Sequence, residues 1–347
     1  MMHSTLVSRS RSRAIALAVV LVVLAGIFVG VADLREAGRL LDRTDWSRLP
    51  PALLLTVVSY VSTSAALVVL CGPMGIEAPR GPMLRIAVIS VAVNNLVSFG
   101  GVAGYSLRAA LSKPHGVAAG HSLAMSLTHA YLNNLFMFLL LAVGLFLLVN
   151  GPAMDPAWRR TLEAAGVLAV AFVLFSTAAL FSGAVRRAIL AGVVRLSSRL
   201  PVRGRISLAT ASDELDEALA RAARALRRAP RAMLLPVTFL GLHWCAMVGA
   251  FWCCLSAFTG VVDVDVLVGG FSVGAVAGFA SLLPGGIGVQ DGSLAAVLAL
   301  QGVSVEAAVL AVLLFRLVYY LTPFVATLPL YALALRQRGR DGFEGDT

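Results

Sequence analysis

The feature that most constrains this fold is a series of long apolar runs. Six of them are long enough to cross a bilayer, since roughly 20 helical residues span its hydrocarbon core, and they lie at 14–32, 51–71, 121–149, 162–184, 232–259 and 305–335. The composition agrees, because 59% of the residues are hydrophobic and only 13% are charged, outside the range of soluble domains. The sequence therefore predicts an all-α polytopic membrane protein with six spanning helices.

The arginines and lysines decide how two further apolar stretches, 84–98 and 266–283, are placed. Cytoplasmic loops of membrane proteins carry an excess of these residues. If 84–98 crossed the membrane, the loop 185–231 with its eleven arginines would lie outside. If it turns at 98–104 and returns through 105–112, then 21 of the 28 basic residues lie inside and six outside. The sequence thus predicts a re-entrant hairpin that enters from the cytoplasm.

The segment 266–303 is predicted to form a second re-entrant hairpin, which enters from outside and turns at LPGGIGVQDG. A kink in one continuous helix is the alternative. With two hairpins of opposite orientation, the chain reads as an inverted repeat of three spans and a hairpin. The predicted parts are a tail at 1–13, a transmembrane domain at 14–335 with repeats 14–149 and 162–335 and the basic loop 185–231, and a tail at 336–347. Both tails are expected in the cytoplasm of a multi-pass cell-membrane protein.

The two hairpin turns are predicted to meet near the midplane and to frame a polar cavity. Irregular backbone at membrane depth is tolerated only where it is buried in protein or lines a cavity. Ser122, Ser126, His129 and Asn133 follow at spacings of four, three and four, so they share one helix face. The residues expected to bind a substrate there are Asn94, Asn95, Arg108, His129, Asn133, Pro284, Gly285, Gly286, Asp291, Arg316 and Tyr320.

Asp291 and Arg316 are expected to meet at the second turn. Asp291 lies near the start of the returning helix, where the positive helix end favours a carboxylate. Arg316 lies roughly 18 Å into the last span at 1.5 Å per residue. Its remaining donors could bind a phosphate, or the pair could be purely structural. Other polar groups also have structural readings: His129 and Asn133 as interhelical hydrogen-bonding groups, and the small residues Gly270, Gly274 and Gly278 as a close helix contact.

The basic loop and the motif search limit the function classes. Leu208, Leu215, Leu219 and Leu226 form an apolar stripe, which predicts surface helices against anionic headgroups; a plain charged connector is the alternative. No recognition motif accompanies the arginines, so no nucleic-acid partner is expected. The four cysteines lack metal-ligand spacing, and no catalytic motif of the common hydrolase or nucleotide-binding types occurs. No metal or other cofactor is expected.

Three segments carry a family resemblance. NNLVSFGGVAGYSLRAAL (94–111), THAYLNNLF (128–136) and the block from LPGGIGVQDGS to LTP (283–323) resemble the lysylphosphatidylglycerol synthase transmembrane region, also called the flippase-like domain family. The resemblance implies paired re-entrant helices and, in two-part synthases, movement of an aminoacylated phospholipid between leaflets. Only 12 residues follow the last apolar run, so the soluble aminoacyltransferase domain of those synthases is not expected.

Several positions depart from the pattern of that family. Members often carry an acid where Tyr105 stands, acids near the positions of His129 and Asn133, and a glutamate where Asp291 stands, whereas Arg108 and Arg316 are retained. A cavity with fewer acids suits an anionic or zwitterionic headgroup better than a strongly cationic one.

The expected function is translocation of a phospholipid or related amphiphile between leaflets, without enzymatic activity. One alternative is a non-catalytic membrane partner of a separate lipid-modifying or glycosyl-transferring enzyme. An intramembrane enzyme that uses Asp291 and His129 is a third reading.

Overall fold

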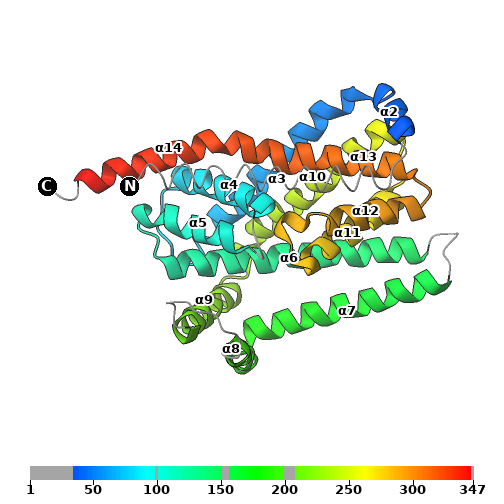
Figure 1. Ribbon diagram of the computed structural model, residues 1–347. Helices are drawn as coiled ribbons and strands as arrows, with labels where there is room; N and C mark the ends of the chain where they lie inside the picture. The colour runs from blue at the N-terminus through cyan, green and yellow to red at the C-terminus, as the bar shows by residue number, and fades with distance from the viewer. Residues whose placement is uncertain (1–33, 98–100, 151–155, 198–207, 345–347) are drawn as a thin grey trace.

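The computed structural model describes residues 34–97, 101–150, 156–197 and 208–344, and all regular structure within these ranges is helical (Figure 1). The α-helices are α2 (Leu34–Asp42), α3 (Leu49–Val69), α4 (Arg80–Val97), α5 (Val102–Ser112), α6 (Ala119–Val149), α7 (Pro156–Phe181), α8 (Gly183–Ser197), α9 (Leu208–Arg228), α10 (Leu234–Thr259), α11 (Val264–Ser281), α12 (Val289–Leu300), α13 (Val305–Phe315) and α14 (Thr322–Glu344). A π-helical segment, Arg316–Leu321, joins α13 to α14. The all-α fold class is confirmed.

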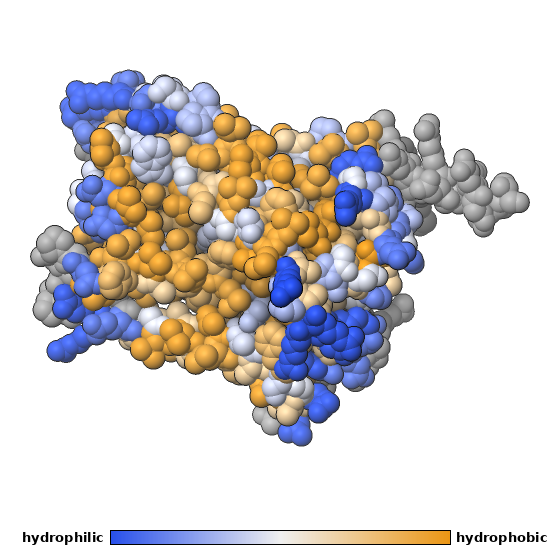
Figure 2. Space-filling view, turned by 180° about the vertical axis from the view of Figure 1, so that it is seen from behind, coloured by the Kyte–Doolittle hydropathy of each residue, from blue (hydrophilic) through white to orange (hydrophobic). Residues whose placement is uncertain are grey.

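Six helical segments are long and apolar enough to cross a membrane: Trp46–Val69, Ala119–Val149, Glu163–Phe181, Arg231–Thr259, Val264–Ser281 and Val305–Ala334. Five coincide with predicted spans, and the predicted span 14–32 lies outside the described residues. The additional segment is α11, which the sequence placed in a hairpin. Figure 2 shows the consequence for the surface: a broad hydrophobic belt separates two hydrophilic ends.

Helical hairpins occur at both predicted places. In the first, α4 and α5 pack antiparallel, and a Cβ on Gly104 would lie only 2.7 Å from the backbone oxygen of Ser90. In the second, α11 and α12 pack antiparallel, and a Cβ on Gly274 would lie 2.8 Å from the Cβ of Leu294. The glycine ridge of α11 is therefore a close helix contact. Whether each hairpin is re-entrant in a membrane stays a prediction, since α11 by itself has the length of a span.

Helices of each half of the chain pack against helices of the other half. Helix α3 of the first half packs along α10 of the second. Helix α6 packs on the second hairpin through α11, and α14 packs on the first hairpin through α4. In Figure 1 the first hairpin occupies one end of the bundle and the second hairpin the other. This reciprocal packing agrees with an inverted repeat, which stays a prediction.

The basic loop forms α8 and α9 at the end of the bundle that also holds α5 and the start of α6 (Figure 1). Arg186 is buried and pairs with Asp216, which joins α8 to α9. Leu219 and Leu226 of the predicted stripe pack with Leu180 at the end of α7. These two leucines contact protein on one side and stay partly exposed, and contact of the stripe with anionic headgroups stays a prediction.

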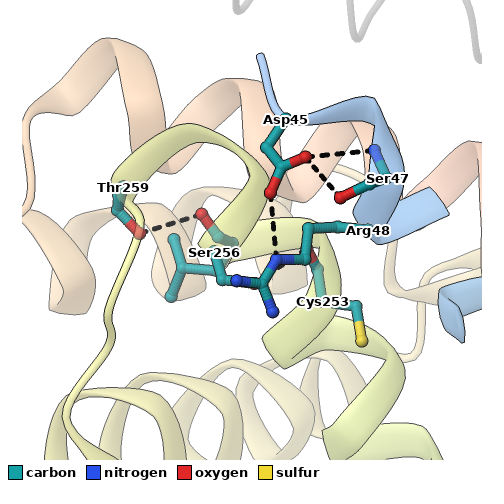
Figure 3. Close-up of polar contacts among 7 residues, drawn as sticks. Asp45, Ser47, Arg48, Cys253, Ser256 and Thr259 are labelled. Carbon is teal, nitrogen blue, oxygen red and sulfur yellow. Dashed lines mark hydrogen bonds and ion pairs between the residues drawn. The ribbon is translucent and has the colours of Figure 1, made fainter.

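The opposite end of the bundle holds a smaller polar cluster, shown in Figure 3. Asp45 accepts hydrogen bonds from the backbone N–H and the hydroxyl of Ser47, at 3.1 and 2.5 Å, and pairs with Arg48 at 3.2 Å. The Arg48 guanidinium lies over the Trp252 ring, 5.5 Å from its centroid, and the Asp45 amide donates to the carbonyl of Ala257. These contacts fix the start of α3 to the end of α10.

Candidate functional site

The break in the second hairpin lies against the end of α4, in the first hairpin. Gly285 lies in the break between α11 and α12 at φ 59°, a left-handed conformation that glycine adopts without strain. A Cβ on it would lie 2.8 Å from the carbonyl oxygen of Asn95, near the end of α4. Leu282 has φ 54° and is the single described non-glycine residue with positive φ. Such backbone persists where the surrounding structure enforces it, often at functional sites. The break of the second hairpin thus contacts the end of α4, whereas residues 98–100 of the first turn lie outside the described residues, so full convergence of the two turns stays a prediction.

A cavity of about 500 Å³ lies beside these turns. Eight predicted site residues line it: Asn94, Asn95, Arg108, His129, Asn133, Gly285, Gly286 and Tyr320. Pro284, Asp291 and Arg316 are not among the lining residues. The predicted site is thus divided into a group that faces the cavity and a group that lies behind the second turn.

The group behind the turn is built around an ion pair. Arg316 Nε donates to Asp291 Oδ1 at 2.6 Å, and Arg316 Nη1 donates to the carbonyl of Gly285 at 2.6 Å. The other carboxylate oxygen of Asp291 accepts from the Gly288 amide at 2.9 Å, which caps α12. Both charged side chains are 6% exposed. The pair fastens the break to the last helix, while Nη2 of Arg316 has no hydrogen-bond partner among the described residues.

Tyr320 connects this pair to the cavity. The guanidinium of Arg316 lies over its ring, 4.3 Å from the centroid, within the range of a cation–π contact. Its hydroxyl accepts from the amide of Gln290 at 3.0 Å. Both Tyr320 and Arg316 lie in the π-helical segment, and such segments are frequent at functional sites.

Arg108, in α5 of the first hairpin, has a different environment from Arg316. It is 2% exposed. Its Nε donates to the hydroxyl of Ser90 at 3.1 Å, and its Nη1 donates to that of Ser126 at 2.6 Å. The Tyr105 ring centroid lies 5.9 Å away. No carboxylate pairs with it among the described residues, so this buried charge is held by neutral groups alone.

The face of α6 predicted from its spacing does point inward. His129 Nε2 lies 3.0 Å from the Thr63 hydroxyl of α3, and Asn133 Oδ1 accepts from Trp244 Nε1 at 3.1 Å. Both contacts are interhelical, and both residues line the cavity. The packing interpretation and the binding interpretation of these residues are therefore compatible.

Several lining residues were not predicted. Tyr105, Gln290, His243 and Trp244 contribute to the cavity wall. The signal for Gln290 was its place beside Asp291, and that for Tyr105 its place beside the first turn. For Trp244 no sequence signal pointed inward. No cluster of three or more metal-ligating side chains occurs in the part of the chain that the structure describes.

The chain is similar to a known protein family over most of its length. Residues 13–326 match the family described as lysylphosphatidylglycerol synthase TM region. The chain belongs to this family. The match includes both hairpins and every cavity-lining residue. A phosphatidylglycerol lysyltransferase of Staphylococcus haemolyticus (strain JCSC1435) is 32% identical over 117 residues, which cover 30% of this chain and 14% of that protein. The similarity thus concerns a small part of that relative.

Proposed function

We propose that this multi-pass membrane protein translocates a phospholipid or related amphiphile between leaflets. The observation that carries the proposal is the cavity beside the two hairpin turns. Irregular backbone at membrane depth is tolerated only where it is buried in protein or lines a cavity. A cavity of about 500 Å³ falls within the range of small-ligand sites.

The walls of the cavity suit an amphiphile. One part carries amide, imidazole and guanidinium groups from α4, α5 and α6. The part near the break carries Phe279, Leu282 and Leu283; Leu282 is 67% exposed and Leu283 45%. Exposed leucines at the rim allow acyl chains to stay in lipid while a headgroup enters the polar part. A headgroup that crosses the bilayer in a polar path avoids much of its desolvation cost.

Reconstitution into liposomes tests the proposal. Fluorescent phospholipids are placed in both leaflets, and dithionite bleaches those in the outer leaflet. With an active translocator the bleached fraction rises from about half toward completion, whereas protein-free liposomes stay near half. A purified protein that leaves the fraction unchanged for lipids of every headgroup charge would exclude translocation by the chain alone.

The name of the relative supports a second candidate, a non-catalytic membrane partner of a separate lipid-modifying enzyme. In that case translocation or enzyme activity appears only when both proteins share a membrane. The absence of enzymatic activity in the chain itself belongs to this proposal as well. Incubation of the purified protein with labelled lipids, followed by mass spectrometry, checks it: any new lipid species contradicts it.

We also propose that the chain resides in the cell membrane with both termini in the cytoplasm, and that its basic end contacts anionic headgroups. Arg187, Arg224, Arg228 and Arg231 are exposed at this end. Each basic contact near an anionic surface contributes about 1 kcal/mol. Replacement of these four by glutamine is expected to weaken co-sedimentation of the detergent-solubilised protein with anionic vesicles; unchanged co-sedimentation contradicts this contact.

A further inference from the structure

We propose that the cavity selects amphiphiles with a net negative headgroup, and that Arg108 is the residue that binds the anionic group. Selective transport of anionic lipids would rest on the proposed translocation, whereas selective binding of anionic lipids does not depend on it. Three observations support it: the charges of the residues that face the cavity, the lack of a carboxylate partner for Arg108, and the pairing of Arg316 with Asp291 outside the cavity.

The charges that face the cavity are of one sign. Among the described residues that line it, Arg108 is the one with a permanent charge, and no aspartate or glutamate is present. The remaining polar lining is neutral, from hydroxyl, amide and imidazole groups. In the low dielectric of a membrane interior an uncompensated charge acts over a longer distance than in water. The field in this cavity therefore attracts anions and repels cations.

Arg108 keeps donors for a ligand. Its two side-chain contacts use Nε and Nη1 and lead to serine hydroxyls, so neither neutralises it. A buried charge is costly unless it is paired, and intramembrane ionisable residues commonly mark substrate paths. The planar guanidinium suits phosphate oxygens. An anionic headgroup would supply the partner that the described residues do not.

Neutral side chains around Arg108 add to this preference. The side-chain oxygen of Asn133 already accepts from Trp244, which leaves its N–H donors for a ligand in the cavity. Charge-assisted hydrogen bonds of such donors to phosphate are stronger than neutral ones. Arg316, by contrast, does not line the cavity and is neutralised by Asp291. Arg108 and Arg316 therefore have different roles in this proposal: Arg108 binds the ligand, and Arg316 stabilises the fold.

A binding competition tests the inference directly. The purified protein in neutral detergent is offered phosphatidylglycerol, phosphatidylcholine and a trimethylammonium lipid with matched acyl chains, and native mass spectrometry reports the bound species. We expect at least about 10-fold tighter binding of the anionic lipid, the range of one charge-assisted contact. Equal binding, or preference for the neutral or cationic lipid, overturns the inference.

Variants locate the preference in the cavity. Arg108→Gln is expected to abolish most of it, and Asn133→Asp, which places a carboxylate in the cavity, to reduce or reverse it. Arg48→Gln at the cluster of Figure 3 serves as the control, because this partly exposed arginine lies outside both the cavity and the basic loop. It should keep the preference. If Arg108→Gln fails to fold, Asn133→Asp decides by itself.

Two results would overturn the assignment even if the wild-type protein prefers anionic lipid. One is a preference that survives Asn133→Asp; the other is a preference lost in Arg224→Gln of the basic loop and kept in Arg108→Gln. The dithionite assay then separates this inference from the proposed function. Selective binding without transport of any lipid would refute translocation and keep the site, whereas transport at equal rates for all headgroups, without selective binding, would refute the site and keep translocation.

Discussion

The two hairpins of this protein have similar turns and different chemistry. Glycine with positive φ occurs in the described part of each turn, at Gly101 in the first and at Gly285 and Gly286 in the second, and each hairpin is associated with one buried arginine. The second hairpin neutralises its arginine with Asp291, whereas the first leaves Arg108 with hydroxyl groups and a tyrosine ring. The difference teaches that burial alone does not reveal the role of a charged side chain, whereas its hydrogen-bond and ion-pair partners do.

We therefore propose that the buried charges of the second hairpin have a structural role. Arg316 of the π-helical segment contacts Asp291 and the Gly285 carbonyl, and Asp291 also caps α12 through the Gly288 amide. The first hairpin presents its arginine to the cavity instead. Perturbations of the second should mainly change stability, and perturbations of the first should mainly change ligand binding.

The largest expected effect is an all-or-none difference in labelling between the two hairpins. With the exposed Cys245 replaced by serine, a cysteine at Lys113 should react with an impermeant maleimide only from the cytoplasmic side, and one at Ser304 only from outside. The reason is that each hairpin is predicted to return to the side it entered. Right-side-out and inside-out vesicles give the measurement. Labelling of the Lys113 site from outside would mean that the first hairpin crosses the membrane, and it would contradict the inverted repeat.

Next in size is the loss of the ion pair. Asp291→Asn should destabilise the protein by about 3–5 kcal/mol, because it leaves Arg316 buried without a counter-charge. Thermal unfolding in detergent measures this. Arg108→Gln should cost much less, since it removes an unpaired charge and leaves no carboxylate behind. Equal losses at the two sites would erase the distinction between the hairpins.

The Arg316→Lys variant sharpens the same comparison. Charge is kept, but one ammonium group cannot reproduce the separate contacts that Nε and Nη1 make to Asp291 and Gly285. A structural role predicts stability between those of the wild type and Asp291→Asn, with translocation falling only in proportion to folded protein. Translocation lost with the fold intact would move the headgroup site to Arg316.

A smaller effect is expected from a methyl group at the meeting point of the turns. Gly285→Ala places a Cβ 2.8 Å from the Asn95 carbonyl at φ 59°, and the left-handed conformation alone costs about 1–2 kcal/mol. Gly292→Ala in α12 is the matched control, because no atom lies within 4 Å of its added Cβ. That change should be neutral or slightly stabilising. A Gly285→Ala protein as stable as the control would mean that the turns are not in firm contact.

The smallest expected effect is a change in the unfolding temperature on replacement of Asp45, in the cluster of Figure 3. The hydrogen bond from the Ser47 hydroxyl, with the neighbouring Ser47 amide and Arg48, lowers the pKa of this carboxyl. A lowered pKa means that Asp45 stabilises the fold above its ordinary pKa of about 4. The contribution is lost as the pH falls through the lower folded value. Asp45→Asn should slightly lower the unfolding temperature at pH 7, and the gap should close below about pH 4.

Much of the fold followed from periodicity and charge. Apolar runs predicted five of the described spans, and the glycine breaks predicted the hairpins. The spacing of Ser126, His129 and Asn133 predicted an inward face, because residues three and four apart share one side of a helix. The roles of the site residues were harder to predict. Arg108 and Arg316 cannot be distinguished by sequence, since each is an isolated arginine in an apolar segment.

The sequence by itself determined that the chain is a helical membrane protein, where its helices break and which polar side chains share a face. These properties depend on local spacing and on the energy of polar groups in lipid, and both can be read along the chain. The tertiary structure alone decided which buried arginine is neutralised, that Trp244 and Gln290 border the cavity, and that Leu219 and Leu226 of α9 pack against the end of α7. Each of these depends on contacts between segments far apart in sequence, such as Asn133 with Trp244, whose register no local pattern specifies.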